Sequence, residues 1–393
     1  MVDSLNALVT SRAEACELWA DLEPLRFEDQ YYLVRTHRRY LTWGFCELLC
    51  EESLRLATVD AARAVERAEI AVLVSDLLKD DEPVTDRRLY QLRGYAWAHD
   101  GNARRVLGDL RSAEESFAIA EAWWEAGEAA LGDCLGYEPV VLDLKASLRI
   151  AQRRFPEAFA LLDRIYAIHQ QGDRPEHKDA HLAGRALVTK ALALAEMNEP
   201  EKSIELLEQA EGMVRMERDP RLVLCLRHNL LWDLTTVERH EEAAGRLPGV
   251  VALCRELGNP LDLIRLRWAE GKIAAGLGRS EEAMEILGGL RQDFIDRDMA
   301  YDAALVTLEL TELYARNGCA AEVKELSLQM ASIFHSQDVP REALAALLFF
   351  QKAAQRERVT AELAREIATF LQQLRANPAL RFERGKATFL NNL

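Results

Sequence analysis

Residues 97–120 read WAHDGNARRVLGDLRSAEESFAIA, and this stretch decides the fold. Its apolar and small residues recur at three- and four-residue spacings, which is typical of two amphipathic helices, here separated by a Gly-Asp turn at 108–109. Trp97 is large enough to fill the space between neighbouring helix pairs, whereas Gly101 lets the second helix approach closely. Ala113 is small enough for the pair to close. The stretch therefore predicts a tightly packed helical hairpin.

The small residue of the second helix can be followed along the chain. Its successive positions are Ala64, Ala113, Ala158, Ser203, Ala243, Ala283 and Val323. The intervals between them are 49, 45, 45, 40, 40 and 40 residues. Such regular intervals predict stacked hairpins that each pack on their neighbours. Ala, Leu, Glu and Arg dominate the segments between turns and period-two alternation is almost absent, so the predicted fold class is all-α.

The spacing of Trp97, Gly101 and Ala113, continued by Phe117 and Ala120, resembles the tetratricopeptide repeat. This resemblance implies a right-handed superhelical solenoid of about seven or eight helical hairpins. The usual repeat of that family is about 34 residues, so the longer intervals here predict extended helices or connections. The array also resembles the repeat half of certain bacterial regulators, in which a helix-turn-helix domain often precedes the repeats.

The resemblance divides the chain into four predicted segments. Residues 1–37 are expected to form helices that precede the array, and they are too few for a helix-turn-helix domain. The repeats themselves cover 38–340. A pair of apolar helices at 341–378 is expected to cap the hydrophobic end of the solenoid, as terminal repeats do. Residues 379–393 contain few apolar residues and are expected to form a mobile tail.

The composition argues against several classes of partner. Among 393 residues, 49 are Lys or Arg and 65 are Asp or Glu, which gives a formal net charge of −16. An acidic chain repels phosphate backbones and anionic membranes, so we expect no direct nucleic-acid or membrane binding. No apolar stretch approaches the roughly 20 residues that span a bilayer, and no signal peptide is evident. The seven scattered cysteines fit reduced thiols in a cytoplasm.

Sequence motifs for catalysis are missing. The chain has no G-x-x-x-x-G-K-S/T loop, no G-x-S-x-G elbow and no C-x-x-C pair. His177 and His181 are four residues apart and are suitable zinc ligands, but a third ligand is not evident. Cys46 and Cys50 have the same spacing and fit small core residues better than ligands. We therefore expect no enzyme activity, no cofactor and no metal.

On the tetratricopeptide pattern, the first helix of each hairpin lines the concave wall, where partners bind. The predicted wall residues are Asn102, Arg105, Arg185, His228, Asn229, Trp232, Arg265, Trp268 and Lys272. Arg and Lys can pair with carboxylates of an extended peptide, and Asn can pair with its backbone amides. The alternative is that Trp232 and Trp268 are core residues between hairpins.

These observations favour a regulatory scaffold or adaptor that recognises a protein or peptide partner through the concave face of the solenoid. The alternative is a sensor in which a peptide or small ligand changes the solenoid and thereby a partner interaction. A metalloprotein or enzyme is the third hypothesis, and it rests on His177 and His181. The sequence indicates neither the identity of the partner nor an oligomeric state.

Overall fold

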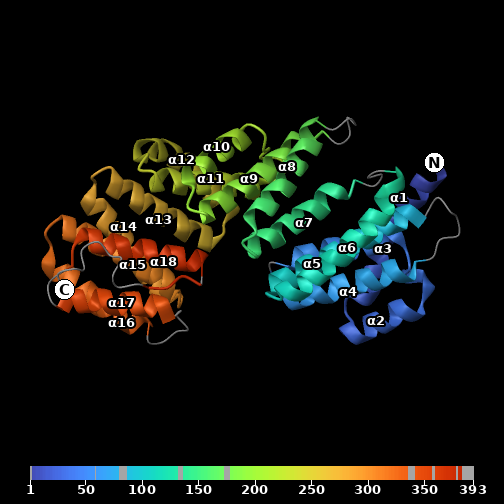
Figure 1. The fold of residues 1–393 in the computed structure, drawn as a ribbon, viewed down its shortest axis with the longest axis horizontal. Helices are drawn as coiled ribbons and strands as arrows, with labels where there is room; N and C mark the ends of the chain where they lie inside the picture. Colours follow the sequence, from blue (N-terminus) through green and yellow to red (C-terminus); the bar gives the residue numbers. More distant parts are fainter. Residues whose placement is uncertain are drawn as a thin grey trace. The chain divides into compact units, whose positions relative to one another are not determined.

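The computed structural model describes residues 2–57, 59–78, 86–131, 136–171, 178–334, 341–355, 359–377 and 379–382. Over these residues the chain is helical, with one short 3₁₀ turn at Arg38–Tyr40 and no strand. The chain divides into two compact units, an N-terminal unit (Met1–Ala193) and a C-terminal unit (Leu194–Leu393). The predicted all-α fold of helical hairpins is confirmed (Figure 1).

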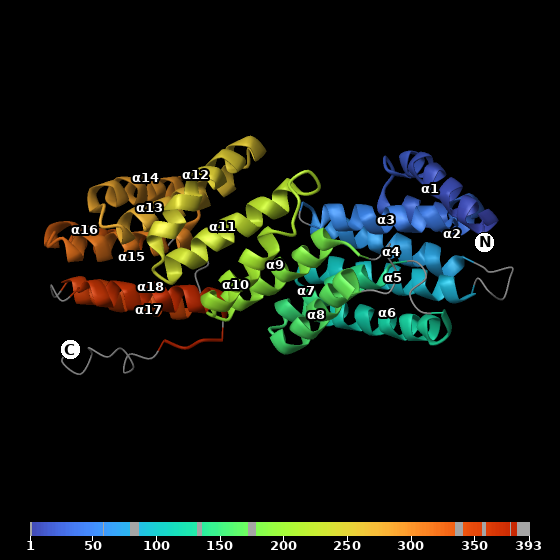
Figure 2. The ribbon, with the colours of Figure 1, turned by 90° about the horizontal axis from the view of Figure 1, so that it is seen from above.

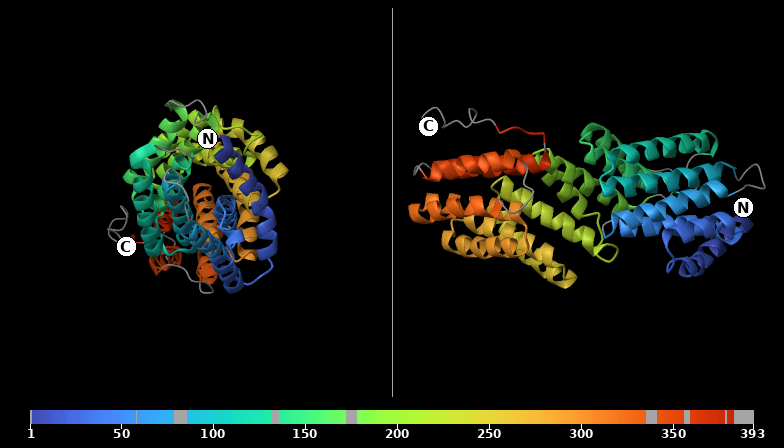
Figure 3. Two further views of the ribbon diagram at one scale, coloured as in Figure 1. Left: turned by 90° about the vertical axis from the view of Figure 1, so that its right-hand side faces the viewer. Right: turned by 90° about the horizontal axis from the view of Figure 1, so that it is seen from below.

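In the N-terminal unit, first and second helices alternate along the chain. The first helices are α1 (Val2–Leu22), α3 (Trp43–Leu56), α5 (Asp86–Leu107) and α7 (Glu138–Ala151). The second helices are α2 (Phe27–Thr36), α4 (Ala61–Leu77), α6 (Leu110–Leu131) and α8 (Phe155–Gln171). Figure 3 (right) shows these helices stacked in chain order from blue to green. A continuous apolar core runs through α1 to α7, from Ala15 to Leu148.

Helix α9 (Ala180–Glu196) contains the boundary between the units, and the C-terminal unit continues the alternation. Its further helices are α10 (Pro200–Glu211), α11 (Pro220–Thr236), α12 (His240–Leu257), α13 (Pro260–Gly276), α14 (Ser280–Asp296), α15 (Ala300–Arg316), α16 (Ala320–Phe334), α17 (Arg341–Gln355) and α18 (Ala361–Ala376). From α9 to α16, a helix begins every 20 residues, so each hairpin spans 40.

The predicted small residues all occupy the same position in their helices. Each is the fourth residue of its helix, from Ala64 in α4 to Val323 in α16, and all seven are buried. Ala364 holds the same place in α18 and is also buried, although the sequence interval did not reveal it. The predicted role of Gly101 is confirmed, because a Cβ there would lie 2.7 Å from the ring of Phe117. Close packing of helices therefore requires small residues at these positions, and their spacing is what identifies the repeat in the sequence.

A left-handed turn precedes these small residues. Five residues before the small residue, the backbone φ is positive in six successive hairpins. The residues are Gly108, Arg153, Asn198, Glu238, Gly278 and Gly318. Gly and Asn adopt this conformation readily, whereas Arg and Glu do so at a steric cost. The left-handed turn is therefore a structural requirement of the repeat, but only some of the hairpins have a residue that adopts it readily.

Two first helices in the C-terminal unit, α11 and α13, begin with the same pattern of a capping residue followed by proline. Asp219 caps α11 by accepting a 2.9 Å hydrogen bond from the Leu222 amide, and Asn259 caps α13 through the Leu261 amide. A proline follows each cap, where its fixed φ suits the first turn and no amide donor is needed. These caps set the register with which the first helices present their side chains.

The last hairpin packs differently from those before it. Helix α17 packs on α16, and α18 packs on both α17 and α15, so the four helices enclose a common core. Figure 2 shows the red ribbons of α17 and α18 next to those of α15 and α16. Arg375 forms a 2.8 Å ion pair with Asp302, and Arg365 forms one of 2.6 Å with Glu312. As a result α18, the second helix of the last hairpin, lies against α15, the first helix of the preceding hairpin.

Candidate functional site

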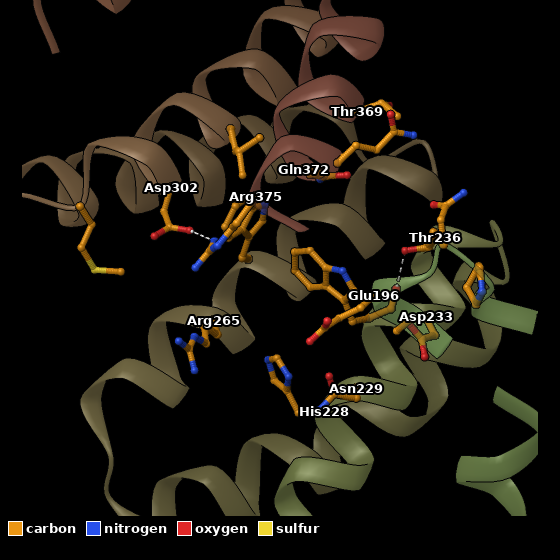
Figure 4. Close-up of a pocket in the computed structure, with 18 of the residues that line it drawn as sticks. Glu196, His228, Asn229, Asp233, Thr236, Arg265, Asp302, Thr369, Gln372 and Arg375 are labelled. Carbon is orange, nitrogen blue, oxygen red and sulfur yellow. Dashed lines mark hydrogen bonds and ion pairs between the residues drawn. The ribbon is translucent and has the colours of Figure 1, made fainter. Parts of the chain in front are cut away.

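A pocket of about 470 Å³ opens in the C-terminal unit (Figure 4). Its walls come mainly from the last turn of α9, from the first helices α11, α13 and α15, and from α18. The lining residues are Ala195, Glu196, Asn198, Pro200, His228, Asn229, Trp232, Asp233, Thr236, Arg265, Trp268, Phe294, Met299, Asp302, Leu305, Thr369, Gln372, Gln373 and Arg375. The pocket thus lies on the first-helix face, where the wall was predicted.

Five of the six wall residues predicted for this unit line the pocket: His228, Asn229, Trp232, Arg265 and Trp268. The sixth, Lys272, lies behind them. Its Nζ is 4.8 Å from the centroid of the Trp232 ring and 3.5 Å from Oε1 of Glu309. The structure therefore brings the six residues together, with five at the surface of the pocket and Lys272 supporting one of them.

Aromatic rings form the apolar part of the pocket. The rings of Trp232 and Trp268 meet edge to face with centroids 5.3 Å apart, and Trp268 packs in the same way on Phe294 at 5.6 Å. Trp268 is only 5% exposed, whereas Trp232 is partly exposed. Each tryptophan is therefore both a core residue, because its ring packs between hairpins, and a wall residue, because it lines the pocket.

The polar part of the pocket comes from α11 and α13. The Nδ2 of Asn229 donates a 2.7 Å hydrogen bond to the Cys225 carbonyl, which fixes the orientation of the amide. Burial lowers the pKa of His228, and the nearby Arg265 guanidinium lowers it further. The imidazole is therefore neutral at neutral pH. Arg265 is exposed, and the ion pairs within the described ranges do not include its guanidinium.

Asp233 is a buried acid at the edge of the pocket. It is 3% exposed, and its Oδ2 has no hydrogen-bond partner among the residues that the structure describes. Burial raises the pKa of Asp233 to about 6 because a carboxylate loses its hydration there. The side chain is therefore available to accept or donate a proton near neutral pH.

Sequence reasoning missed the contribution of α18. Thr369, Gln372, Gln373 and Arg375 line the pocket from this helix, and the hydroxyl of Tyr301 on α15 donates a hydrogen bond to the Leu371 carbonyl. The segment was read only as a cap. No local signal marks these residues, because a polar helix face next to an apolar one is typical of any capping helix. Their role follows from the packing of α18 on α15.

The three wall residues predicted for the N-terminal unit do not line this pocket. Asn102 is 3% exposed, and its Oδ1 accepts a 2.9 Å hydrogen bond from Nη2 of Arg105. Burial lowers the pKa of Arg105. Arg185 pairs with Asp143 at 3.1 Å, and burial raises the pKa of that carboxyl. These side chains come from α5, α7 and α9 and form polar contacts within their own unit.

The other residues singled out in the sequence have plain positions. Cys46 and Cys50 are buried in the core of the N-terminal unit. His181 is buried, whereas His177 lies outside the described residues. Within the described ranges, no group of three or more His, Cys, Asp or Glu side chains is placed to hold a metal ion. The helices described are also too short or too polar to cross a membrane.

Comparison with known proteins bears on the fold. No protein-family model and no curated protein matches the chain. The crystal structure of a Rap protein complexed with Competence and Sporulation Factor is similar over 86% of this chain and 95% of that one, with a TM-score of 0.52 and 15% sequence identity. The apo form of RapI is similar over 70% of this chain and 99% of that one, with a TM-score of 0.47 and 13% identity. The recurring hairpins and the similarity to the Rap complex together show that this chain has a tetratricopeptide-type helical-repeat fold.

Proposed function

We propose that the protein is a regulatory scaffold that binds an extended peptide, or an extended segment of a partner protein, in the pocket of the C-terminal unit. It acts by binding and catalyses no reaction. The observation that carries the proposal is the combination in one pocket of two tryptophans with side-chain amides and an exposed arginine. An extended peptide offers free backbone amides and carbonyls, which side-chain amides of Asn and Gln can pair with.

The chemistry of the pocket supports this choice of ligand. Asn229 projects from α11, and Gln372 and Gln373 project from α18, so amide groups come from two walls. Arg265 supplies a guanidinium suited to a carboxylate, either an acidic side chain or a chain terminus. Trp232 supplies apolar area that a peptide side chain can cover. Each element of a peptide thus has a matching group in the pocket.

The similarity in fold gives separate support. The Rap protein of similar fold was crystallised with Competence and Sporulation Factor bound, so a helical-repeat chain of this architecture can hold a regulatory factor. We extend only that capacity to this chain, since fold alone does not determine the ligand. A cytoplasmic location belongs to the same proposal.

Selection from a random peptide library tests the proposal. Wild-type protein is used to select heptapeptides, and their dissociation constants are then measured by fluorescence anisotropy. The pocket variant is Arg265→Ala with Gln372→Ala. The control is Arg255→Ala, which removes an exposed arginine of α12 outside the pocket. Equal melting temperatures establish that the folds are comparable.

We expect the selected peptides to bind the pocket variant at least about tenfold more weakly than wild type, which corresponds to about 1.4 kcal/mol. The Arg255→Ala control is expected to bind them as wild type does. Peptides that bind the pocket variant with unchanged affinity would place the binding surface elsewhere. Failure to select any peptide with wild-type protein would refute peptide binding itself.

A further inference from the structure

A second cavity, of about 580 Å³, lies in the N-terminal unit and has a different chemistry. One face of each of three helices lines it. Helix α2 contributes Phe27, Glu28 and Tyr31, and α4 contributes acids at Glu69 and Asp76, seven residues apart. Helix α5 contributes Trp97, Asp100 and Arg104, also within two turns. The cavity lies within one unit, so its geometry does not depend on the other.

Negative charge dominates this cavity. Its lining holds four carboxylates and one arginine, a net charge of −3 when all are ionised. Arg104 is already used, because its Nε lies 2.7 Å from Asp100 and its Nη2 lies 2.9 Å from Glu69. The guanidinium of Arg93 acts on Asp76 through its charge, but it donates to the Ser75 carbonyl and lies over the ring of Trp123. Among the described residues Glu28 and Asp76 form no ion pair, so both carboxylates are available to a ligand.

Aromatic rings line the same space. Phe27 and Tyr31 lie one turn apart on α2, with ring centroids 5.9 Å apart, and Trp97 faces the cavity from α5. Aromatic faces attract organic cations through the ring quadrupole, and carboxylates attract them by charge. Rings and acids together are the usual composition of a site for an ammonium or guanidinium group.

Two polar atoms at this cavity lack partners. Asp100 is 1% exposed, and while its Oδ2 accepts from Ser116 and Arg104, its Oδ1 has no hydrogen-bond partner among the described residues. The indole Nε1 of Trp97 is buried and likewise has no partner there. An unpaired buried carboxylate oxygen is unfavourable, and a cationic donor in the cavity would relieve that cost.

We propose that the cavity between α2, α4 and α5 binds an organic cation, namely an alkyl guanidinium or ammonium group of the kind that arginine and lysine side chains carry. The cation lies between the rings of Tyr31 and Trp97 and pairs with Glu28 and Asp76. Its source is either a basic side chain of a partner protein or a free small amine, and the two share this chemistry. The proposal is independent of the peptide pocket.

Titration calorimetry with the full-length protein tests the site. The probe is Nα-acetyl-argininamide, and its control is the citrulline analogue, in which a neutral urea replaces the guanidinium at nearly the same size. The site variant is Glu28→Gln with Asp76→Asn. The matched control is Glu115→Gln with Glu125→Gln, which removes two exposed acids of α6 and changes the net charge equally.

We expect the arginine probe to bind and the citrulline probe to bind at least about tenfold more weakly. The site variant should bind the arginine probe about tenfold more weakly than wild type, since two exposed ion pairs are lost. The α6 control and Arg265→Ala should bind it as wild type does. Quenching of tryptophan fluorescence that disappears in Trp97→Phe would locate the probe beside that ring.

The proposal is wrong if citrulline binds as well as arginine, if the site and α6 variants behave alike, or if no probe binds at about 10 mM. A pentapeptide with a central arginine between alanines then identifies the source of the cation. Much tighter binding of the pentapeptide than of the single residue would assign the cavity to a partner's side chain. Equal binding would assign it to a small free cation.

Discussion

The indole Nε1 of Trp268 donates a 2.6 Å hydrogen bond to Oε2 of Glu309. The two residues belong to successive first helices, α13 and α15. The other oxygen of Glu309 lies 3.5 Å from Nζ of Lys272, and that ammonium lies over the ring of Trp232. One carboxylate thus holds two predicted wall residues and, through Lys272, a third. Glu309 therefore fixes the aromatic side of the pocket in the C-terminal unit.

Replacing Glu309 is expected to loosen this arrangement. Glu309→Leu leaves the buried Trp268 indole N–H without an acceptor, so the free energy of unfolding should fall by about 1–3 kcal/mol in urea titrations. Glu309→Gln keeps an acceptor and should lose less. Lys272→Met is the control, because it removes the partly exposed ion pair and leaves the indole bonded. Equal losses in Glu309→Leu and Glu309→Gln would show that the hydrogen bond is unimportant.

The left-handed turns predict opposite effects of substitution in neighbouring hairpins. Glu238 has φ 61°, and Gly278 holds the same place one repeat later with φ 76°. Glu238→Gly relieves steric strain and should raise stability by about 0.5–1 kcal/mol, after the entropic cost of glycine. Gly278→Ala should lower it by about 1 kcal/mol, since open space surrounds the site and only the backbone is affected. Melting temperatures of the two variants, measured in parallel with wild type, test this prediction. A shift of the melting temperature in the same direction in both variants would contradict it.

Gly101 predicts a steric effect rather than a backbone one. A Cβ there would lie 2.7 Å from the ring of Phe117, which is fully buried. Gly101→Ala should therefore destabilise the protein by about 1–3 kcal/mol. Gly288→Ala is the matched control, because it also lies inside a helix but meets open space, and alanine should stabilise it by up to about 1 kcal/mol. Similar effects at the two positions would remove close packing as the explanation.

What the sequence could predict depends on how local the constraint is. Positions such as Gly101 and Ala283 accept only small residues because two helices pack closely there. The fold could therefore be predicted from the spacing of these small residues alone. The wall residues of α11 and α13 followed from helix register, because each of those helices begins at a cap and a proline. Lys272 shows the limit of that register, since it supports the pocket from behind.

The rest depends on packing that no spacing encodes. Gln372 and Arg375 line the pocket because α18 packs on α15, whereas a regular repeat would place a first helix there. Nothing in the sequence around Glu309 distinguishes it from an acid on a solvent-exposed helix face. The burial of Asn102 likewise depends on its neighbours, because the same residue type in α11 reaches the pocket. Tertiary contacts, not motifs, decided each of these positions.

Asp233 provides the last prediction, which concerns pH. Burial raises the pKa of its carboxyl from 3.8 to about 6 in the folded protein. Between these pH values the folded state binds more protons than the unfolded state, so Asp233 reduces stability as pH rises from about 4 to 6 and contributes a constant penalty above that. Asp233→Asn cannot ionise. Wild type should therefore lose stability relative to this variant across that window, by at most about 3 kcal/mol.

Urea titrations of wild type and Asp233→Asn at pH values from about 4 to 8 measure this difference. Taking the difference cancels the other carboxylates, which titrate in both proteins. Glu205→Gln, which removes an exposed acid of α10, serves as the control for the loss of one negative charge. A wild-type minus Asp233→Asn difference that stays constant with pH would mean that the Asp233 carboxyl keeps an ordinary pKa. That result would also remove Asp233 as a proton-accepting group at the edge of the pocket.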